Sequence, residues 1–191
     1  MHPQSFYNRP TLKVAQDLLG CFLVRKINGE IIKAKIVETE AYAGPKDLAS
    51  HASRGETERN KVMFGKPGII YVYFTYGMHY MLNIVTEERG YPAAVLIRAA
   101  EPSVNSKFKI QNSKLFTNGP ARLTKALKID KSFNGLLIYA KKYGLWIESR
   151  DEDLKPRQII KTTRVGVDYA GEYKNKLWRF YIKDNKFVSK K

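Results

Sequence analysis

Short apolar runs separated by turn residues occur along the first hundred positions, a pattern that is typical of β-strands. Residues 21–27 and 31–40 are two such runs, and Asn28-Gly29 between them is the favoured dipeptide of a two-residue hairpin turn. Further strands are predicted at residues 69–74, 81–86 and 93–99. The chain therefore begins with a series of strands that follow one another closely.

Helical periodicity is limited to two short segments. Residues 10–19 place four apolar side chains on one stripe, and Pro10 and Gly20 suit the two ends of a helix. Residues 121–127 follow a Gly-Pro pair and are expected to form a second helix. Between two predicted strands lie the polar residues 41–66, and a connection of this length is often functional.

The second half of the chain is less regular. Short strands are predicted at residues 135–139, 145–147 and 177–182, and the polar, basic residues 105–117 are expected to form a surface connection. We find no internal repeat and no convincing linker. Because the strands do not alternate regularly with helices, we predict the α+β class. The prediction is one mixed domain over residues 1–191, with flanking helices around a curved, mostly antiparallel sheet.

Length and composition narrow the class of protein. A chain of 191 residues with 43% hydrophobic positions is long enough to bury a core without disulfides or a structural metal. No apolar run approaches the roughly 18 residues of a membrane span, and the first ten residues lack a signal-peptide layout. The single cysteine, Cys21, allows a reducing compartment.

Positive charge is the strongest compositional feature. The formal net charge is +16; residues 1–102 carry a net +3 and residues 103–191 a net +13. Such a field attracts polyanions and accelerates their encounter. Nucleic acid is therefore the favoured partner, against the alternatives of a solubilising lysine-rich surface or a membrane surface.

Two carboxylates stand out in the strand predicted over residues 31–40. Glu38 and Glu40 are two residues apart, so they project from one face, and Tyr42 continues the same spacing. An unpaired carboxylate costs several kcal/mol to bury. These side chains therefore form a solvated edge, pair with arginine or make a site. Arg98, at the end of an apolar strand, is an available partner for Glu40.

Aromatic side chains are concentrated in residues 71–76, where Tyr71, Tyr73, Phe74 and Tyr76 precede Gly77. Tyrosine joins a stacking surface to a hydroxyl group, which suits base recognition as well as a half-buried sheet. Within a strand the core role is the commoner one. Tyr76, beside the glycine turn, is the better candidate for exposure.

The remaining polar candidates are isolated in the sequence. His51 lies in the polar loop after the carboxylate strand, and Asn83 lies within an apolar strand, where it either caps a loop or lines a pocket. Three histidines and one cysteine form no cluster with zinc-ligand spacing, so we expect no metal site.

The ordered motifs of the chain resemble those of the alkyladenine, or 3-methyladenine, DNA glycosylase family. The resemblance extends over nearly the whole chain. Its motifs are Ile36-Val37-Glu38-Thr39-Glu40-Ala41-Tyr42, Ser50-His51, Arg59-Asn60, Lys66-Pro67-Gly68, Tyr71-Val72-Tyr73, Tyr76-Gly77-Met78, Asn83-Ile84-Val85, Leu96-Ile97-Arg98-Ala99-Ala100-Glu101-Pro102, Asn118-Gly119-Pro120 and Arg164-Val165-Gly166-Val167.

This resemblance implies a monofunctional enzyme of base-excision repair. Such an enzyme flips an alkylated or deaminated purine out of duplex DNA and hydrolyses its N-glycosidic bond, leaving an abasic site. The implied fold is one mixed domain without a helix-hairpin-helix motif. No cofactor is implied, the partner is duplex DNA rather than a membrane, and we expect a monomer in the cytoplasm or wherever the DNA is held.

The family's roles map onto single positions of this chain. Glu40 matches the general base, and Arg98 the residue that helps to hold the attacking water. The side chains that match the base pocket are Tyr42, His51, Tyr73 and Asn83, the last of which is thought to reject the guanine amino group. Tyr76 matches the side chain that fills the gap in the base stack, and Met78 beside the same turn is grouped with it as DNA-intercalating.

The chemistry of these residues agrees with the resemblance. N-glycoside cleavage passes through a cationic sugar, which one nearby carboxylate can stabilise while it takes a proton from water. Glu38 is then expected to be structural. Two other classes of function remain open: a metal-dependent nuclease that uses Glu38 and Glu40, and a non-catalytic module that binds lesions in DNA.

Overall fold

The computed structural model describes residues 1–75, 77–103 and 117–190. Its strands are β1 (Phe22–Ile27), β2 (Glu30–Ala43), β3 (Ile70–Thr75), β4 (His79–Val85), β5 (Ala93–Pro102), β6 (Leu145–Glu148), β7 (Ile159–Thr162) and β8 (Arg179–Ile182). Its α-helices are α1 (Gln4–Tyr7), α2 (Thr11–Asp17) and α3 (Pro120–Ala126). Short 3-10 helices are η1 (His51–Arg54), η2 (Lys61–Phe64), η3 (Lys131–Phe133), η4 (Lys141–Tyr143), η5 (Pro156–Gln158) and η6 (Gly171–Asn175).

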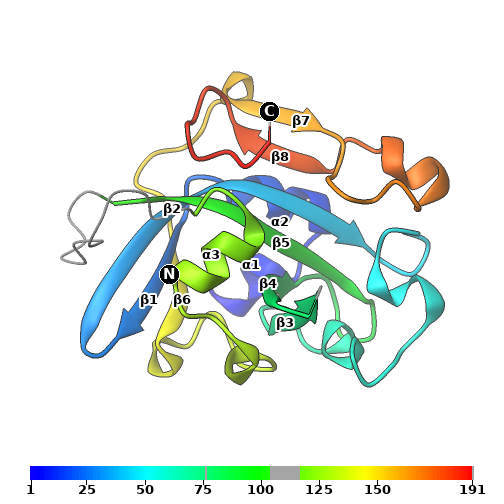
Figure 1. Cartoon of the computed structure of the whole chain (residues 1–191), viewed down its shortest axis with the longest axis horizontal. Helices are drawn as coiled ribbons and strands as arrows, with labels where there is room; N and C mark the ends of the chain where they lie inside the picture. Colours follow the sequence, from blue (N-terminus) through cyan, green and yellow to red (C-terminus); the bar gives the residue numbers. More distant parts are fainter. Residues whose placement is uncertain (76, 104–116, 191) are drawn as a thin grey trace.

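The strands of the described residues form one eight-stranded sheet. Its main path is β3-β4-β5-β2-β1-β6, while β8 pairs with β2 and β7 pairs with β8. Every one of these pairs is antiparallel. Figure 1 shows β2 and β5 bending along their length through the middle of the molecule. The predicted α+β class with an antiparallel sheet is confirmed, and the extent of the domain over residues 1–191 stays a prediction.

The first hairpin forms where the sequence predicts it. Asn28 has φ 51° and Gly29 has φ 84°, so both central residues of the turn adopt the positive φ that the favoured two-residue hairpin turn requires. β1 and β2 pair from Ile27 and Glu30 outward. The predicted strands at residues 69–74, 81–86 and 93–99 correspond to β3, β4 and β5, and both predicted helices are present.

Other predictions about local structure are wrong or incomplete. Residues 135–139 form turns rather than a strand, and they join the sheet through an isolated bridge between Ile69 and Leu137 and through backbone hydrogen bonds to Ile70 of β3. Turns at residues 134–135 and 138–139 leave this apolar run too short to form a strand that pairs along its length with a neighbour. Neither α1 nor β7 was predicted. The connection predicted over residues 105–117 lies outside the described residues except at its last position.

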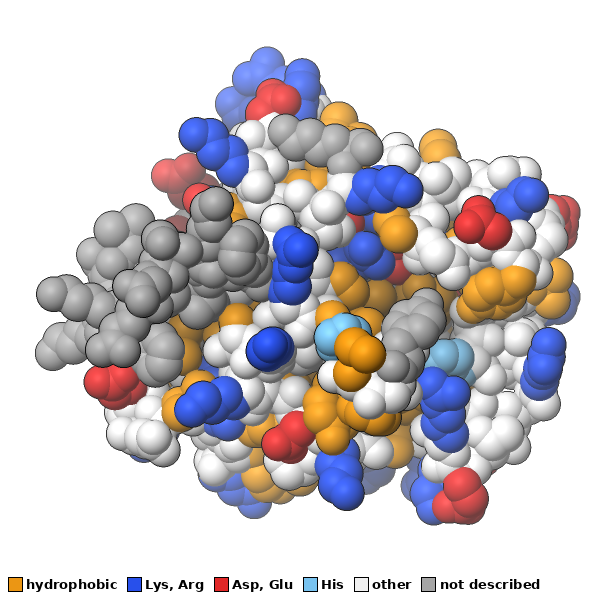
Figure 2. Space-filling model, in the orientation of Figure 1, with side chains coloured by type: hydrophobic (Ala, Val, Ile, Leu, Met, Phe, Trp, Pro, Cys, Tyr) orange, Lys and Arg blue, Asp and Glu red, His pale blue; other side chains and the backbone are white. Residues whose placement is uncertain are grey.

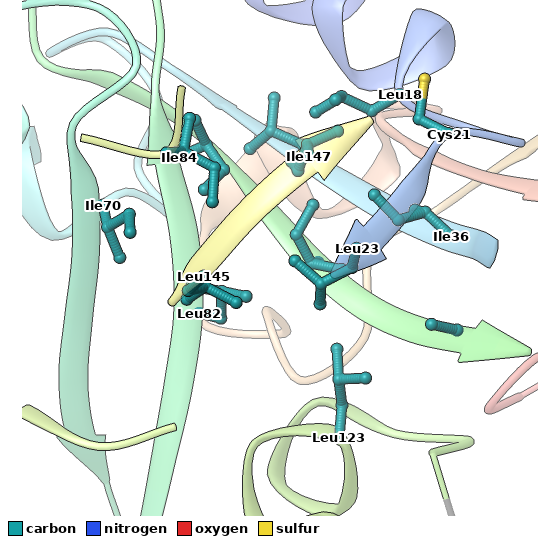
Figure 3. Packing of buried hydrophobic residues seen from close by; sticks show 14 of the residues in the cluster. Leu18, Cys21, Leu23, Ile36, Ile70, Leu82, Ile84, Leu123, Leu145 and Ile147 are labelled. Carbon is teal, nitrogen blue, oxygen red and sulfur yellow. The ribbon is translucent and has the colours of Figure 1, made fainter. Parts of the chain in front are cut away.

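The main core lies against one face of the central strands. α2 packs on β2 and β5, and α3 packs on β4 and β5. In Figure 3, side chains from several strands, among them Leu23, Leu82 and Ile147, lie between Leu18 at the end of α2 and Leu123 on α3. All five belong to one buried cluster, so the helices and the curved sheet share a single core.

A break in the alternation of β2 decides which of its side chains reach this core. Ile32, Ala34 and Ile36 belong to the core cluster, but so does Ala41, which differs from them by an odd number of residues. The pairing between β2 and β5 is irregular around Glu38. Such an irregularity reverses the face on which the following side chains lie. Regular alternation would place Glu38 and Glu40 on the core face, but the irregularity places both side chains on the opposite face of the sheet.

Two smaller clusters hold the loops that follow β2. Ala52 and Met63, from η1 and η2, pack with Tyr71 and Ala94 of the sheet. Ala49 packs with Val167 and Ala170 of the segment before η6. These contacts fix the predicted functional loop against the face of the sheet opposite the core.

None of the helices in the described part of the chain combines the length and the apolar character that crossing a bilayer requires.

Candidate active site

A cavity of about 460 Å³ lies on the face of the sheet opposite the main core. Side chains from four adjacent strands, β2 to β5, line it, because alternate residues of each strand point to this face. These strand residues are Tyr42, Tyr71, Tyr73, Thr75, Met81, Asn83, Ala94, Leu96 and Arg98. Its volume is in the range of pockets that bind small ligands.

Two loops and the start of α3 complete the wall of the cavity. The loop after β2 contributes Ser50, His51 and Arg59, and the loop before η6 contributes Val165, Gly166, Val167 and Tyr169; Pro120 comes from the first turn of α3. The cavity therefore combines a rigid floor of strand residues with walls of loop residues.

Glu40 is fully buried directly behind this wall. The backbone N–H of Val165 donates to its Oε1 at 2.8 Å, and the Tyr42 hydroxyl donates to its Oε2 at 2.8 Å. Arg98 Nη1 lies 3.2 Å from Oε1. All three partners line the cavity. A carboxylate has about four acceptor positions, of which the Val165 N–H and the Tyr42 hydroxyl occupy two, while Arg98 forms an ion pair with Glu40.

Arg98 bridges the two glutamates of β2. Its Nε donates to Glu38 Oε1 at 2.9 Å, while its Nη1 faces Glu40. The ion pair between Arg98 and Glu40 that the sequence suggested is thus present. Arg98 also forms an ion pair with Glu38. Burial opposes the charged guanidinium, but Glu40 and Glu38 outweigh that effect and raise the pKa of Arg98.

Glu38 is bound by groups that come from the end of the chain. Arg179 Nη1 donates to its Oε1 at 2.9 Å, and the Ser189 hydroxyl donates to the same oxygen at 3.0 Å. The Ser189 backbone N–H donates to Oε2 at 2.7 Å. Glu38 is fully buried, as Glu40 is, but its partners Arg179 and Ser189 are not among the residues that line the cavity. The expectation that Glu38 is structural is consistent with this arrangement.

The ring of Tyr42 packs against the buried ion pair of Arg164 and Asp47. Arg164 lies over the Tyr42 ring at 4.8 Å and over the Trp178 ring at 5.0 Å, between the two aromatic groups. Its guanidinium donates to both carboxylate oxygens of Asp47 at 2.6 and 2.8 Å. Burial and the neighbouring Glu40 raise the pKa of Tyr42, so its hydroxyl keeps the proton that it donates.

His51 and two tyrosines form one aromatic group in the wall. The rings of His51 and Tyr73 meet edge to face with centroids 4.4 Å apart, and His51 Nδ1 lies 3.0 Å from the Tyr71 hydroxyl. Burial, with a smaller effect of Arg59, lowers the pKa of His51 to about 4. His51 is therefore neutral at physiological pH. Burial raises the pKa of Tyr73 and brings that of Tyr71 to about 12.

Asn83 lies in the strand floor of the cavity, so it lines a pocket, which is one of the two positions that the sequence left open. Its Nδ2 donates to the backbone oxygen of Tyr71 at 3.2 Å and to that of Met81 at 3.4 Å. These bonds hold the side-chain amide across two neighbouring strands. The amide is therefore a fixed polar group in an otherwise largely aromatic and apolar floor.

The turn between β3 and β4 presents an apolar tip. Met78 is 68% exposed and Phe74 is 48% exposed. Gly77 has φ 67°, a value that glycine adopts without strain. Tyr76, predicted to enter the base stack, lies outside the described residues. The exposure of Met78 agrees with its expected place at a DNA-facing turn, but its role stays a prediction.

Several residues of this site were missed by sequence reasoning. Val165 acts through its backbone N–H, which any residue except proline would provide, so its side chain carries no signal. Arg164, Arg179 and Ser189 are single polar residues that are far from the site in sequence. The Arg164-Val165-Gly166-Val167 motif belonged to the resemblance, but no role was assigned to it. Only the fold brings these groups to the glutamates.

The nuclease alternative needs carboxylates that are free to hold a metal ion. Instead, Glu38 and Glu40 are bound by guanidinium groups, whose positive charge would repel a divalent cation. Across the described ranges, no three His, Cys, Asp or Glu side chains are grouped as metal ligands. This geometry does not favour a metal site at the two glutamates.

The protein surface carries a wide distribution of positive charge. In the view of Figure 2, blue Lys and Arg side chains are spread across the molecule and outnumber the red carboxylates. Positively charged side chains are therefore available on this face for contacts with phosphate groups.

Comparison with known proteins identifies the family. The model of the family described as methylpurine-DNA glycosylase (MPG) matches residues 5–186. A protein of Clostridium perfringens (strain 13 / Type A) is 46% identical over 202 residues, which cover 98% of each chain. A protein of Methanocella arvoryzae is 46% identical over 195 residues, covering 99% of this chain and 96% of the relative. A protein of Carboxydothermus hydrogenoformans is 48% identical over 194 residues, with 99% and 98% covered. Each relative carries a 3-methyladenine DNA glycosylase name. The chain therefore belongs to the methylpurine-DNA glycosylase family and is a DNA glycosylase of base-excision repair.

Proposed function

We propose that this glycosylase removes alkylated purines, 3-methyladenine among them, from duplex DNA by hydrolysis at Glu40. The observation that carries the proposal is the position of Glu40, which is buried behind the cavity wall and held by Val165, Tyr42 and Arg98. The names of the relatives support the choice of substrate.

In the proposed reaction, a water molecule attacks C1′ of the damaged nucleotide. The water oxygen forms a bond to C1′ while Glu40 takes its proton, and the bond from C1′ to the purine nitrogen breaks. The purine leaves with the bonding electron pair. An alkylated purine is already cationic, so it departs as a neutral base and needs no second carboxyl group as an acid.

Arg98 is proposed to hold the attacking water together with Glu40. It lines the cavity and is 7% exposed, so part of the side chain is open to the bound nucleotide. The negative charge of Glu40 also stabilises the positive charge that develops on the sugar. The burial of this pair strengthens both effects, because water does not screen them.

The damaged base is proposed to stack between Tyr42 and the His51–Tyr73 pair. These three rings line the same cavity, and aromatic stacking offsets the few kcal/mol that base extrusion costs. Asn83 is proposed to exclude guanine by opposing its exocyclic amino group. Tyr76 and Met78 are proposed to fill the place that the flipped nucleotide leaves in the duplex.

The partner is proposed to be duplex DNA that contains damaged purines, bound by a monomer in the compartment that holds the DNA. The positive surface charge supports phosphate contacts on a single chain.

The test is to identify the bases that the protein releases from alkylated and from deaminated DNA by mass spectrometry, with and without a metal chelator. We expect free 3-methyladenine, intact abasic strands and the same rate in chelator. Strand cleavage that stops in chelator would support the nuclease instead. Binding to lesion duplex without release of any base would support the non-catalytic module.

A further inference from the structure

The C-terminal segment passes behind the candidate active site. Figure 1 shows it, in red, turning back beside β8 after the strand ends. Ser189 then reaches Glu38, donating its backbone N–H to Oε2 at 2.7 Å and its hydroxyl to Oε1 at 3.0 Å. The preceding Val188 is buried, with 7% of its surface exposed. Val188 and Ser189 are thus docked on the protein.

Ser189 contacts both members of the ion pair between Glu38 and Arg98. Arg98 Nη2 donates to the Ser189 oxygen at 3.2 Å. A serine hydroxyl has one proton to donate and lone pairs to accept with. Donation to Glu38 therefore leaves the oxygen free to accept from Arg98. The hydroxyl links the carboxylate and the guanidinium in one fixed arrangement.

A second contact of the same segment involves Arg179. Its Nη1 donates to the backbone oxygen of Lys190 at 2.7 Å and to Glu38 at 2.9 Å. Its Nε donates to the backbone oxygen of Thr163 at 2.9 Å. Thr163 lies two residues before Val165, whose N–H binds Glu40. The C-terminal segment, β8 and the loop at Glu40 therefore form one hydrogen-bonded unit.

We propose that Ser189 is a positioning residue for base excision, and that it acts by holding Arg98 at Glu40 through Glu38. This inference rests on the roles proposed above for Glu40 and Arg98. Ser189 is not among the residues that line the cavity, so it acts through its neighbours rather than on the nucleotide.

The physical reason is the burial of the charges. Glu38 and Glu40 are fully buried, and Arg98 and Arg179 are 7% and 5% exposed. Buried charges stay in place only while each is hydrogen-bonded. Without the Ser189 hydroxyl, Arg98 loses the partner of its Nη2, and its guanidinium is held at Glu40 by fewer contacts. A misplacement of about 1 Å near a reacting group can lower a rate by about 100-fold.

The experiment compares Ser189→Ala with Ser189→Thr, which retains the hydroxyl. Single-turnover excision is measured at saturating protein, on a duplex with the lesion that the wild-type protein releases fastest. Affinity for the same duplex and the thermal unfolding midpoint are measured in parallel. Asp184→Asn is the control in the same segment, because Asp184 is exposed and its φ of 59° is readily adopted by asparagine.

For Ser189→Ala we expect a rate about tenfold below wild type, with lesion affinity within about twofold. Ser189→Thr should recover most of the rate, and Asp184→Asn should match the wild type. An unchanged rate in Ser189→Ala would overturn the inference. So would a parallel loss of rate and affinity, or a loss that Ser189→Thr does not restore, since either indicates a folding defect. A wild-type protein that releases no purine would instead contradict the proposed function.

Discussion

Glu38 and Glu40 project from the same face of β2, and one guanidinium group, that of Arg98, contacts both carboxylates. Their other partners differ. Glu38 is bound by Arg179 and Ser189, away from the cavity, whereas Glu40 is bound by groups that line it. The two chemically identical side chains therefore have different expected effects on the reaction.

Glu40→Gln is expected to lower single-turnover excision by at least about 100-fold, because it removes the general base but keeps the size of the side chain. Binding to lesion duplex should survive. Glu38→Gln should lower the rate less, but it should destabilise the fold, because two buried arginines lose a charged partner. Excision rates, lesion affinities and denaturant unfolding of the two variants provide the comparison. A fully active Glu40→Gln protein would refute the assignment.

Asn83→Ser is expected to raise the removal of guanine relative to hypoxanthine. The two bases differ by the exocyclic amino group, and a steric or polar clash discriminates between such shapes more strongly than attraction does. The shorter side chain opens space in the strand floor without adding charge. Single-turnover excision from duplexes with one G·T or one hypoxanthine·T pair measures the ratio. If a folded variant keeps the wild-type ratio, Asn83 does not determine this specificity.

Loss of the Asp47 carboxylate is expected to destabilise the protein strongly. Asp47→Ala would leave the guanidinium of Arg164 buried without its counter-ion, at a cost of about 3–5 kcal/mol. The double variant Asp47→Ala, Arg164→Met should lose less stability than the sum of the two single variants, because the second substitution removes the stranded charge. Urea unfolding of all four proteins measures this coupling. Additive losses would show that the pair does not act as a unit.

Acid should destabilise the fold partly through His51. The folded protein keeps this ring neutral down to a pH of about 4, its lowered pKa, whereas a histidine in the unfolded chain takes up a proton near pH 6.5. Between these values the unfolded chain binds more protons, so the free energy of unfolding falls as the pH decreases. One such group contributes at most about 1.4 kcal/mol per pH unit.

The matched variant for this effect is His51→Gln, in which the side chain does not titrate. Unfolding curves at several pH values between 7 and 4.5 should show a smaller loss of stability on acidification than in the wild type. The comparison is needed because the pKa of His2 is also lowered to about 4, so the wild-type curve contains both histidines. Equal losses in the two proteins would contradict the environment assigned to His51.

Met78→Ala is expected to impair excision from duplex DNA more than excision from an unpaired lesion. Met78 lies at the exposed tip between β3 and β4, where it can occupy space in the duplex, and it is not among the residues that line the cavity. Removing its side chain should therefore affect extrusion of the nucleotide rather than bond cleavage. The ratio of single-turnover rates on the two substrates reports this difference. Equal losses on both substrates would argue against a role in flipping.

Much of the sheet was predictable because its signals are local. The Asn28-Gly29 turn and the apolar runs on both sides of it specify the first hairpin without help from the rest of the chain. The carboxylates of β2 were recognisable for a similar reason, since a strand places residues two apart on one face. The partner of Glu40 was found because Arg98 is an isolated charge in an apolar strand.

The remaining features depend on contacts between distant segments. Residues 135–139 have the apolar character of a strand, but they form turns, with an isolated bridge at Leu137 in place of a continuous ladder. The irregular pairing near Glu38 has no sequence signature, although it determines which face the glutamates occupy. The contacts of Ser189 and Arg179 with Glu38 join residues that are more than a hundred positions apart. Neither periodicity nor motif spacing reports such pairings.

The packing of β2 on both faces has a consequence for how the protein tolerates mutation. The six consecutive residues from Ile36 to Ala41 have 0% exposed surface. In a strand with one solvent-exposed face, every second side chain is exposed, and substitutions at the exposed positions are nearly neutral. This stretch has no such positions, because the core occupies one side and the buried charges occupy the other. A random substitution between Ile36 and Ala41 is therefore expected to lower either the amount of folded protein or the activity of each molecule. Few substitutions in this stretch should be neutral.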